Sequence, residues 1–127
     1  MPVIDVGTVF VGVRSLERSI AFYTEALELV CRGIEDWGDG RRGATLFFST
    51  PGSTLFTLTE KEHVQVYKEP LFNLTCTDAS RLHQRLQEEG YQVTELEQWE
   101  TEWNNHYLFD LIDPDGHMIA LIEMNPK

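Results

Sequence analysis

The sequence predicts an α+β fold made of two similar modules, each with the element order β-α-β-β-β. Strand-like and helix-like segments recur in the same order in both halves of the 127-residue chain. A matching strand-to-helix junction supports the repeat, because residues 13–18 correspond in position to residues 76–81. Repetition at about half the chain length predicts one domain, 1–127, with modules at about 5–62 and about 70–125.

The first module begins with a β-branched and aromatic stretch, Val6–Val13, which is typical of a strand. Ser15 ends this strand and can cap a helix. The helix is indicated by apolar residues at roughly helical spacing: Leu16, Ile20, Phe22, Tyr23 and Leu27. The glycine-rich segment Gly33–Gly43 predicts a turn or mobile loop. Two short strands follow, at 44–49 and 54–59, with a Pro-Gly turn signal between them.

The second module repeats this order. A strand is expected at Leu71–Cys76, and Asp78 caps a second helix that ends at Gly90. The remaining strands are expected at Tyr91–Leu96, at about His106–Ile112 and at His117–Glu123. Pro and Gly in the sequence Asp-Pro-Asp-Gly predict a tight turn before the last strand.

The charge balance limits the possible partners. Ten Lys and Arg residues stand against 21 Asp and Glu residues, a formal net charge of −11, so polyanions such as nucleic acid and anionic membranes are repelled. No apolar run reaches the ~20 residues that span a bilayer. The first residues also lack the features of a secretory signal. We therefore expect a soluble, cytoplasmic protein.

The two cysteines, Cys31 and Cys76, are far apart in the sequence and do not form a Cys-x-x-Cys pair. A core of this size needs no disulfide, and each cysteine lies in or next to an apolar stretch. We expect both to be reduced, buried and unreactive.

Three features together resemble the vicinal oxygen chelate superfamily, which includes glyoxalase I, bleomycin-resistance proteins, fosfomycin-resistance transferases and extradiol dioxygenases. They are the repeated module order, the helix pattern Ser15-Leu16-x-x-Ser19-x-x-Phe22-Tyr23-x-x-x-Leu27, and Asp113-Pro114-Asp115-Gly116-His117. The resemblance covers nearly the whole chain. It implies a curled mixed sheet around a cleft and a homodimer, but a shared fold does not imply a reaction.

Catalytic members of that superfamily hold a divalent metal with His and Glu side chains from four strands. The corresponding positions of this chain are Thr8, Thr57, Leu71 and Ala120. Two hydroxyls, an isobutyl group and a methyl group cannot hold such an ion, and shifting each position by one residue supplies no ligand. The sequence therefore predicts neither the family metal site nor another cofactor.

Residues two apart on a strand share a side, so the same four positions predict the residues that face the cleft: Phe10, Leu55, Thr59, Asn73, Thr75, Met118 and Ile122. By analogy with the family, the strand before the Asp-Pro-Asp-Gly turn contributes three more: His106, Leu108 and Asp110. A mostly apolar cleft with few polar groups is typical of a site for an organic ligand. Other polar residues are expected elsewhere: His63 and His83 in solvent, His117 structural or exposed, and Glu123 pointing away.

His106 and Asp110 are the candidate catalytic residues, and both are candidate ligand contacts. They lie about 13 Å apart along one strand, so they cannot form a dyad. His106 could act as a general base or contact a ligand, and Asp110 could anchor a cationic group. The alternatives are a solvated rim histidine and a strand-edge carboxylate. Thr57 and Asn73 are candidate hydrogen-bonding groups for a ligand.

Three tryptophans, Trp37, Trp99 and Trp103, occur in segments expected to be loops or strand ends. An indole ring in such a place can stack on a planar or cationic ligand. The segment 95–103, which contains the last two, has four Glu and no Lys or Arg. The alternative is a solvated acidic loop that the indole rings anchor to a sheet or an interface.

These observations favour a metal-free protein that resembles bleomycin-resistance proteins. Such a protein would sequester a cationic aromatic compound and so confer antibiotic resistance. A metal-independent enzyme of lyase or isomerase type, with His106 or Asp110 as acid or base, is the alternative. A third hypothesis keeps the glyoxalase-like fold but uses an unrelated metal site.

Overall fold

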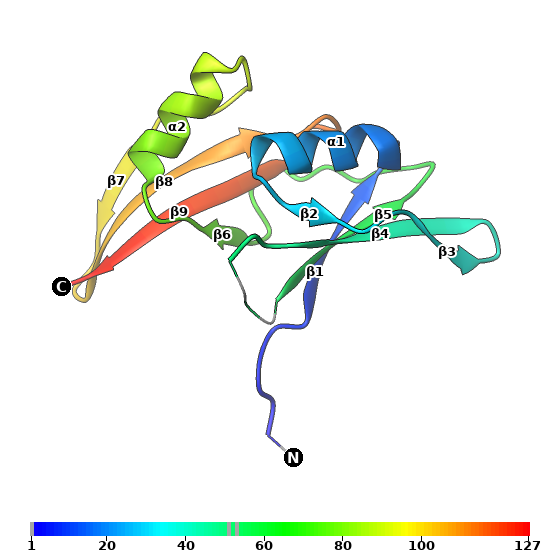
Figure 1. Cartoon of the computed structure of the whole chain (residues 1–127). Helices are drawn as coiled ribbons and strands as arrows, with labels where there is room; N and C mark the ends of the chain where they lie inside the picture. The colour runs from blue at the N-terminus through cyan, green and yellow to red at the C-terminus, as the bar shows by residue number, and fades with distance from the viewer. Residues whose placement is uncertain (1, 51, 53) are drawn as a thin grey trace. The chain divides into compact units, whose positions relative to one another are not determined.

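The computed structural model describes residues 2–50, 52 and 54–127. Over these residues it contains two helices and nine strands, in two compact units, Met1–Gln65 (unit 1) and Val66–Lys127 (unit 2). Each unit consists of one mixed sheet and one helix (Figure 1). The expected α+β fold is confirmed. Unit 2 has the expected order β-α-β-β-β, whereas unit 1 has one more strand after its helix.

Unit 1 contains β1 (Thr8–Val13), α1 (Leu16–Ala26), β2 (Val30–Cys31), β3 (Glu35–Gly38), β4 (Arg41–Phe47) and β5 (Leu55–Glu60). Its strand order is β1-β5-β4-β2, and β3 also pairs with β4. Helix α1 covers one face of this sheet, where the ring of Tyr23 lies 4.8 Å from that of Phe56. Leu16, Leu46 and Leu58 complete this core with no exposed surface.

Unit 2 contains β6 (Asn73–Thr75), α2 (Ala79–Glu88), β7 (Glu97–Glu100), β8 (Asn104–Ile112) and β9 (Met118–Pro126). Its strand order, β6-β9-β8-β7, follows the pattern of unit 1. Leu86 of α2 is fully buried together with Leu111 of β8, so α2 covers one face here as well.

The repeat extends to the side chains that hold each helix in place. The capping residues Ser15 and Asp78 are 63 positions apart (78 − 15), as are Glu60 and Glu123 (123 − 60). Glu60 accepts a hydrogen bond from the first backbone N–H of α1 at 3.2 Å, and Glu123 does so from α2 at 2.8 Å. A carboxylate satisfies an N–H that the helix leaves unpaired and suits the positive end of its dipole. Glu123 therefore points toward α2.

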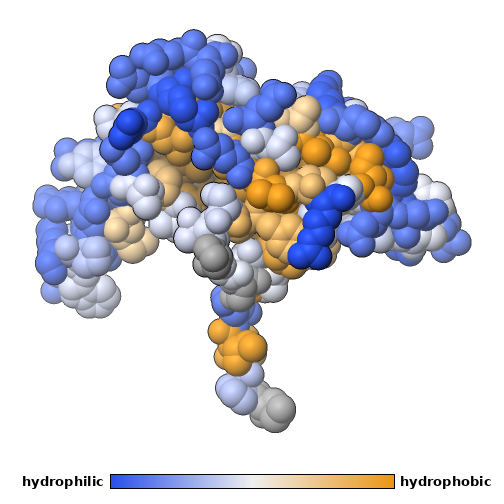
Figure 2. All heavy atoms as spheres, viewed as in Figure 1, coloured by the Kyte–Doolittle hydropathy of each residue, from blue (hydrophilic) through white to orange (hydrophobic). Residues whose placement is uncertain are grey.

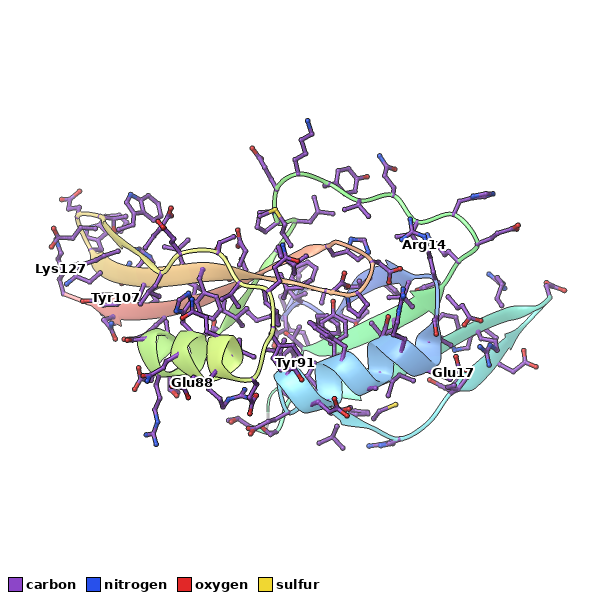
Figure 3. All side chains as sticks on the ribbon, turned by 90° about the horizontal axis from the view of Figure 1, so that it is seen from above. Arg14, Glu17, Glu88, Tyr91, Tyr107 and Lys127 are labelled. Atoms are coloured by element: carbon purple, nitrogen blue, oxygen red, sulfur yellow. The ribbon has the colours of Figure 1, made fainter. Side chains whose placement is uncertain are left out.

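Glu60 also forms two hydrogen bonds with Arg42, each of 2.8 Å. Arg42 in turn contacts Glu17 at 3.2 Å, and Figure 3 shows Glu17 at the end of α1 toward the β3–β4 hairpin. These bonds and the bond from the helix lower the pKa of Glu60. The network ties the start of α1 to the sheet.

The segment Gly33–Gly43 contains the expected turn, but the turn belongs to a hairpin that the sequence analysis did not predict. Strands β3 and β4 pair on either side of a turn in which Gly38, Asp39 and Gly40 all have positive φ. An Asp-Gly sequence with both residues in this conformation is a strong hairpin signal. The surrounding glycines made the flanking strands hard to predict.

The expected strand at Tyr91–Leu96 is also wrong. Only the isolated bridge between Val93 and Leu111 forms there, and the next strand, β7, begins at Glu97. The Thr94 hydroxyl accepts a hydrogen bond from the backbone N–H of Asp110 at 2.8 Å. The Thr94 side chain thus replaces a backbone hydrogen bond that regular strand pairing would form. Strand pairing with β8 resumes only at β7.

The first strand begins two residues later than expected. Hydrophobic residues are visible along the segment before β1 (Figure 2), and Val3 and Ile4 are 95% and 91% exposed. This segment adds nothing to the core. The short strand β2 was not anticipated, and Pro51 and Ser53 of the expected Pro-Gly turn lie outside the described residues. Within the described residues, neither helix is long and apolar enough to cross a membrane.

We predict that Glu60→Gln lowers the free energy of unfolding by about 1 kcal/mol at pH 7, because charge-assisted hydrogen bonds are lost at a partly exposed site. The pKa of Glu60 is lowered in the folded state, so its contribution is present above the ordinary pKa of 4.5 and is lost as the pH falls below it. Urea unfolding at pH 7 and pH 4 measures both effects. Glu62→Gln, at an exposed acidic residue two positions away, is the control; equal losses in the two variants would contradict the prediction.

Candidate functional site

The candidate site lies on the face of the unit 2 sheet that points away from α2, called here the helix-free face of unit 2. Phe109 of β8 points toward α2, where its ring lies 4.9 Å from that of His83. Because side chains alternate along a strand, His106, Leu108 and Asp110 point to the opposite side.

Strand register gives the neighbours of these residues. Ala120 of β9 pairs with Asp110 on one side and with Asn73 on the other. The small alanine side chain thus separates two polar groups, one on β8 and one on β6. In the next row Ile122 pairs with Leu108, so the face alternates between polar and apolar positions.

His106 is the most deeply buried polar side chain of this face, with 5% of its surface exposed. It stacks on Trp99 of β7 with the ring centroids 5.1 Å apart and the planes inclined by 30°. Its Nδ1 atom is buried and has no hydrogen-bond partner in the part of the chain that is described. A buried, unpaired polar atom destabilises the fold.

Two carboxylates lie on the same face as this stack, Glu97 in the next row of paired residues and Asp110 one row farther along. Burial raises the pKa of Asp110, and the negative charge of Glu97 raises it further. Neither side chain has a hydrogen-bond or ion-pair partner among the described residues. Glu100 differs from Glu97, because its carboxylate pairs with Lys127 at 3.2 Å. Figure 3 shows Lys127 at the end of the unit 2 sheet. The unpaired carboxylates of Glu97 and Asp110 lie on the same face as Trp99 and His106.

Glu97 was expected only as one of four acidic residues in segment 95–103. Its position two residues before Trp99 on one strand places both on the same face. That relation depends on where β7 begins, which the sequence did not indicate.

The family metal positions are occupied by residues that do not fit a metal ion. The Thr8 and Thr57 hydroxyl oxygens of unit 1 lie 2.7 Å apart and bond to each other. In unit 2, Leu71 precedes β6 and is 71% exposed, and Ala120 carries no donor atom. Across the described ranges, no three His, Cys, Asp or Glu side chains gather in a way that could hold a metal ion.

The other two tryptophans come from segments outside the strands of the unit 2 sheet. Trp37 belongs to β3 of unit 1, where its ring covers Gly43 so closely that a side chain at that glycine would clash with it. Trp37 and Trp99 thus lie in strands, although loops or strand ends were expected. Trp103 lies in the turn between β7 and β8 and is 75% exposed.

Three expectations about polar residues need correction. His83 is half-buried, and its ring bonds to the backbone oxygen of Thr94 at 2.8 Å, because the α2 residue faces the sheet. Cys31 and Cys76 are half-buried and unpaired rather than fully buried. Burial and nearby carboxylates raise the pKa of Cys76 to about 11, which makes it a poor nucleophile.

Comparison with known proteins decides the family. A sequence model described as Glyoxalase/Bleomycin resistance protein/Dioxygenase superfamily matches residues 5–121. This protein belongs to that superfamily. The four positions that the resemblance assigns to the metal ligands of catalytic members carry Thr, Leu and Ala in this chain.

Several solved structures share the superfamily fold. The antibiotic-binding protein TnmS3 from Streptomyces sp. CB03234 is 23% identical with a TM-score of 0.76, and the match covers 100% of this chain and 99% of that one. A superfamily member from Sphaerobacter thermophilus is 19% identical with a TM-score of 0.78, covering 95% and 98%. A glyoxalase I mutant from Zea mays is 24% identical with a TM-score of 0.70, covering 92% of this chain but 43% of the maize chain. No curated protein matches this sequence.

We predict opposite effects for substitutions at the two histidines of unit 2. His106→Leu should raise the free energy of unfolding by about 0.5–1 kcal/mol, because it removes a buried, unpaired nitrogen while keeping apolar contacts with Trp99. His83→Leu should lower it by about 1 kcal/mol, because it leaves the Thr94 carbonyl without its partner. Urea unfolding measures both variants. A loss for His106→Leu as large as that for His83→Leu would mean that His106 is a structural residue.

Proposed function

We propose that this protein binds a small cationic aromatic compound on the helix-free face of unit 2 and sequesters it without chemical conversion. The observation that carries the proposal is the stack of Trp99 on buried His106, with the carboxylates of Glu97 and Asp110 farther along the same face. An aromatic surface next to unpaired negative charge attracts a planar cation through both the ring and the carboxylates.

Electrostatics supports this choice of ligand. Glu97 and Asp110 are close enough to repel each other, as the raised pKa of Asp110 indicates. A cation bound between them would relieve that repulsion and favour the ionised form of Asp110. The net charge of −11 also favours the approach of cations over anions.

His106 contributes an aromatic ring rather than a polar contact. The ring is buried and stacks on Trp99, so it holds the exposed indole in place for a planar ligand. Sequestration needs only affinity, so no metal or catalytic group is required. The name of TnmS3, an antibiotic-binding protein of the same fold, is consistent with a role in resistance.

An enzyme that acts without a metal is the second candidate. Two observations on the same face favour it: the buried imidazole of His106 with an unpartnered Nδ1 atom, and the raised pKa of Asp110. Acid–base residues often have perturbed environments. This alternative requires turnover. A compound that binds and is recovered unchanged after long incubation supports sequestration, whereas product formation that is lost in His106→Ala or Asp110→Ala supports the enzyme.

We predict that N-methylquinolinium quenches the fluorescence of Trp99 in a saturable manner and that added salt weakens its binding. The double variant Glu97→Gln/Asp110→Asn should bind about tenfold more weakly, because the ligand loses two charge interactions. Binding to the wild type should also weaken as the pH falls through the raised pKa of Asp110, where its carboxylate becomes neutral.

The uncharged isostere 1-methylnaphthalene and the variant Glu102→Gln are the controls for this prediction. Glu102 belongs to the same acidic segment but lies in the exposed turn after β7. The proposal fails if the isostere binds as tightly as N-methylquinolinium, or if Glu102→Gln weakens binding as much as the double variant.

A further inference from the structure

We propose that unit 1 carries a second binding site, for a small zwitterionic molecule such as an amino acid with an apolar side chain. The site is a hollow of about 380 Å³ formed by the residues between β2 and β3 and by strand β4. Its lining residues are Arg32, Gly33, Ile34, Glu35, Thr45 and Phe47. The volume lies at the lower end of the range for small-molecule pockets, so it fits one small ligand.

Arg32 supplies the group that would bind a carboxylate. Its guanidinium carbon lies 4.4 Å from the centre of the Phe47 ring, so stacking holds the side chain at the edge of the hollow. No described residue forms a hydrogen bond or ion pair with this guanidinium. A guanidinium that stacks through its face keeps its N–H groups available for a planar oxyanion.

Glu35 supplies the opposite charge. It lies three residues after Arg32 and lines the same hollow, yet the two side chains do not pair with each other. Among the residues described, Glu35 has no other partner. Two unpaired charges of opposite sign around one hollow match a ligand that carries an anionic and a cationic group.

The rest of the lining fits an apolar body between these charges. Phe47 and Ile34 contribute apolar surface, and Ile34 is 41% exposed although its side chain is large and apolar. The Thr45 hydroxyl forms no hydrogen bond with another described residue and can bond to the ligand. Thr45 and Phe47 alternate with buried Ala44 and Leu46, so both point away from α1.

This site is independent of the proposed function. It shares no residue with the helix-free face of unit 2, and it carries an arginine where that face carries only carboxylates and a histidine. Loss of binding at one site therefore leaves the other available for measurement.

Three matched compounds test the proposal: L-phenylalanine, 3-phenylpropanoate, which lacks its amine, and phenethylamine, which lacks its carboxylate. Each is titrated into ¹⁵N-labelled protein while the backbone amide signals of residues 33–35 and 45–47 are followed by NMR. We expect phenylalanine to bind most tightly, 3-phenylpropanoate about threefold more weakly and phenethylamine at least about tenfold more weakly.

Two variants test which charged residue binds which group of phenylalanine. Arg32→Gln should weaken phenylalanine binding about tenfold, and Glu35→Gln should make phenylalanine and 3-phenylpropanoate bind equally. Arg81→Gln, at an exposed arginine of α2 outside the hollow, is the control and should change neither affinity. Circular dichroism verifies that each variant is folded.

The proposal is overturned if none of the three compounds shifts these amides in a saturable manner, or if phenethylamine binds as tightly as phenylalanine. It is also overturned if Arg32→Gln binds phenylalanine like the wild type. The result with N-methylquinolinium at Trp99 is measured separately, so failure here leaves the function proposed for unit 2 intact.

Discussion

Each sheet of this protein is covered by a helix on one face, and strand alternation then sends every second side chain to the other face. In unit 2, Phe109 and Leu111 pack under α2, so His106, Leu108 and Asp110 point to the opposite side. The helices hold this arrangement because Glu60 and Glu123 bind the first N–H of α1 and α2. The orientation of the site residues therefore depends on the apolar residues that pack under α2, although these apolar residues are not part of the site.

Polar groups on the helix-free face of unit 2 differ from those near the helices in whether they have hydrogen-bond partners within the protein. Glu60, Glu123 and His83 form hydrogen bonds with the backbone and stabilise the fold. The buried nitrogen of His106 lacks such a partner among the described residues, and the pKa of Asp110 is raised by burial and by Glu97. A carboxyl group with a perturbed pKa is expected at a site where a ligand completes the interactions.

The sequence predicted the parts of this structure that depend on local periodicity. The two helices, the capping residues Ser15 and Asp78, and the shared face of His106 and Asp110 follow from spacing and strand alternation. The start of β7 could not be predicted, because the Thr94 hydroxyl replaces a ladder bond through a contact 16 residues away. The Trp99–His106 stack and the Arg32–Phe47 contact also required strand register and three-dimensional positions.

A crystal structure of the protein with bound N-methylquinolinium tests the central claim most directly. We predict that the compound lies against Trp99 on the helix-free face of unit 2, with its charged nitrogen close to the carboxylate of Glu97 or Asp110. A compound that occupies only other surfaces, with Trp99 and both carboxylates free of it, would contradict the claim.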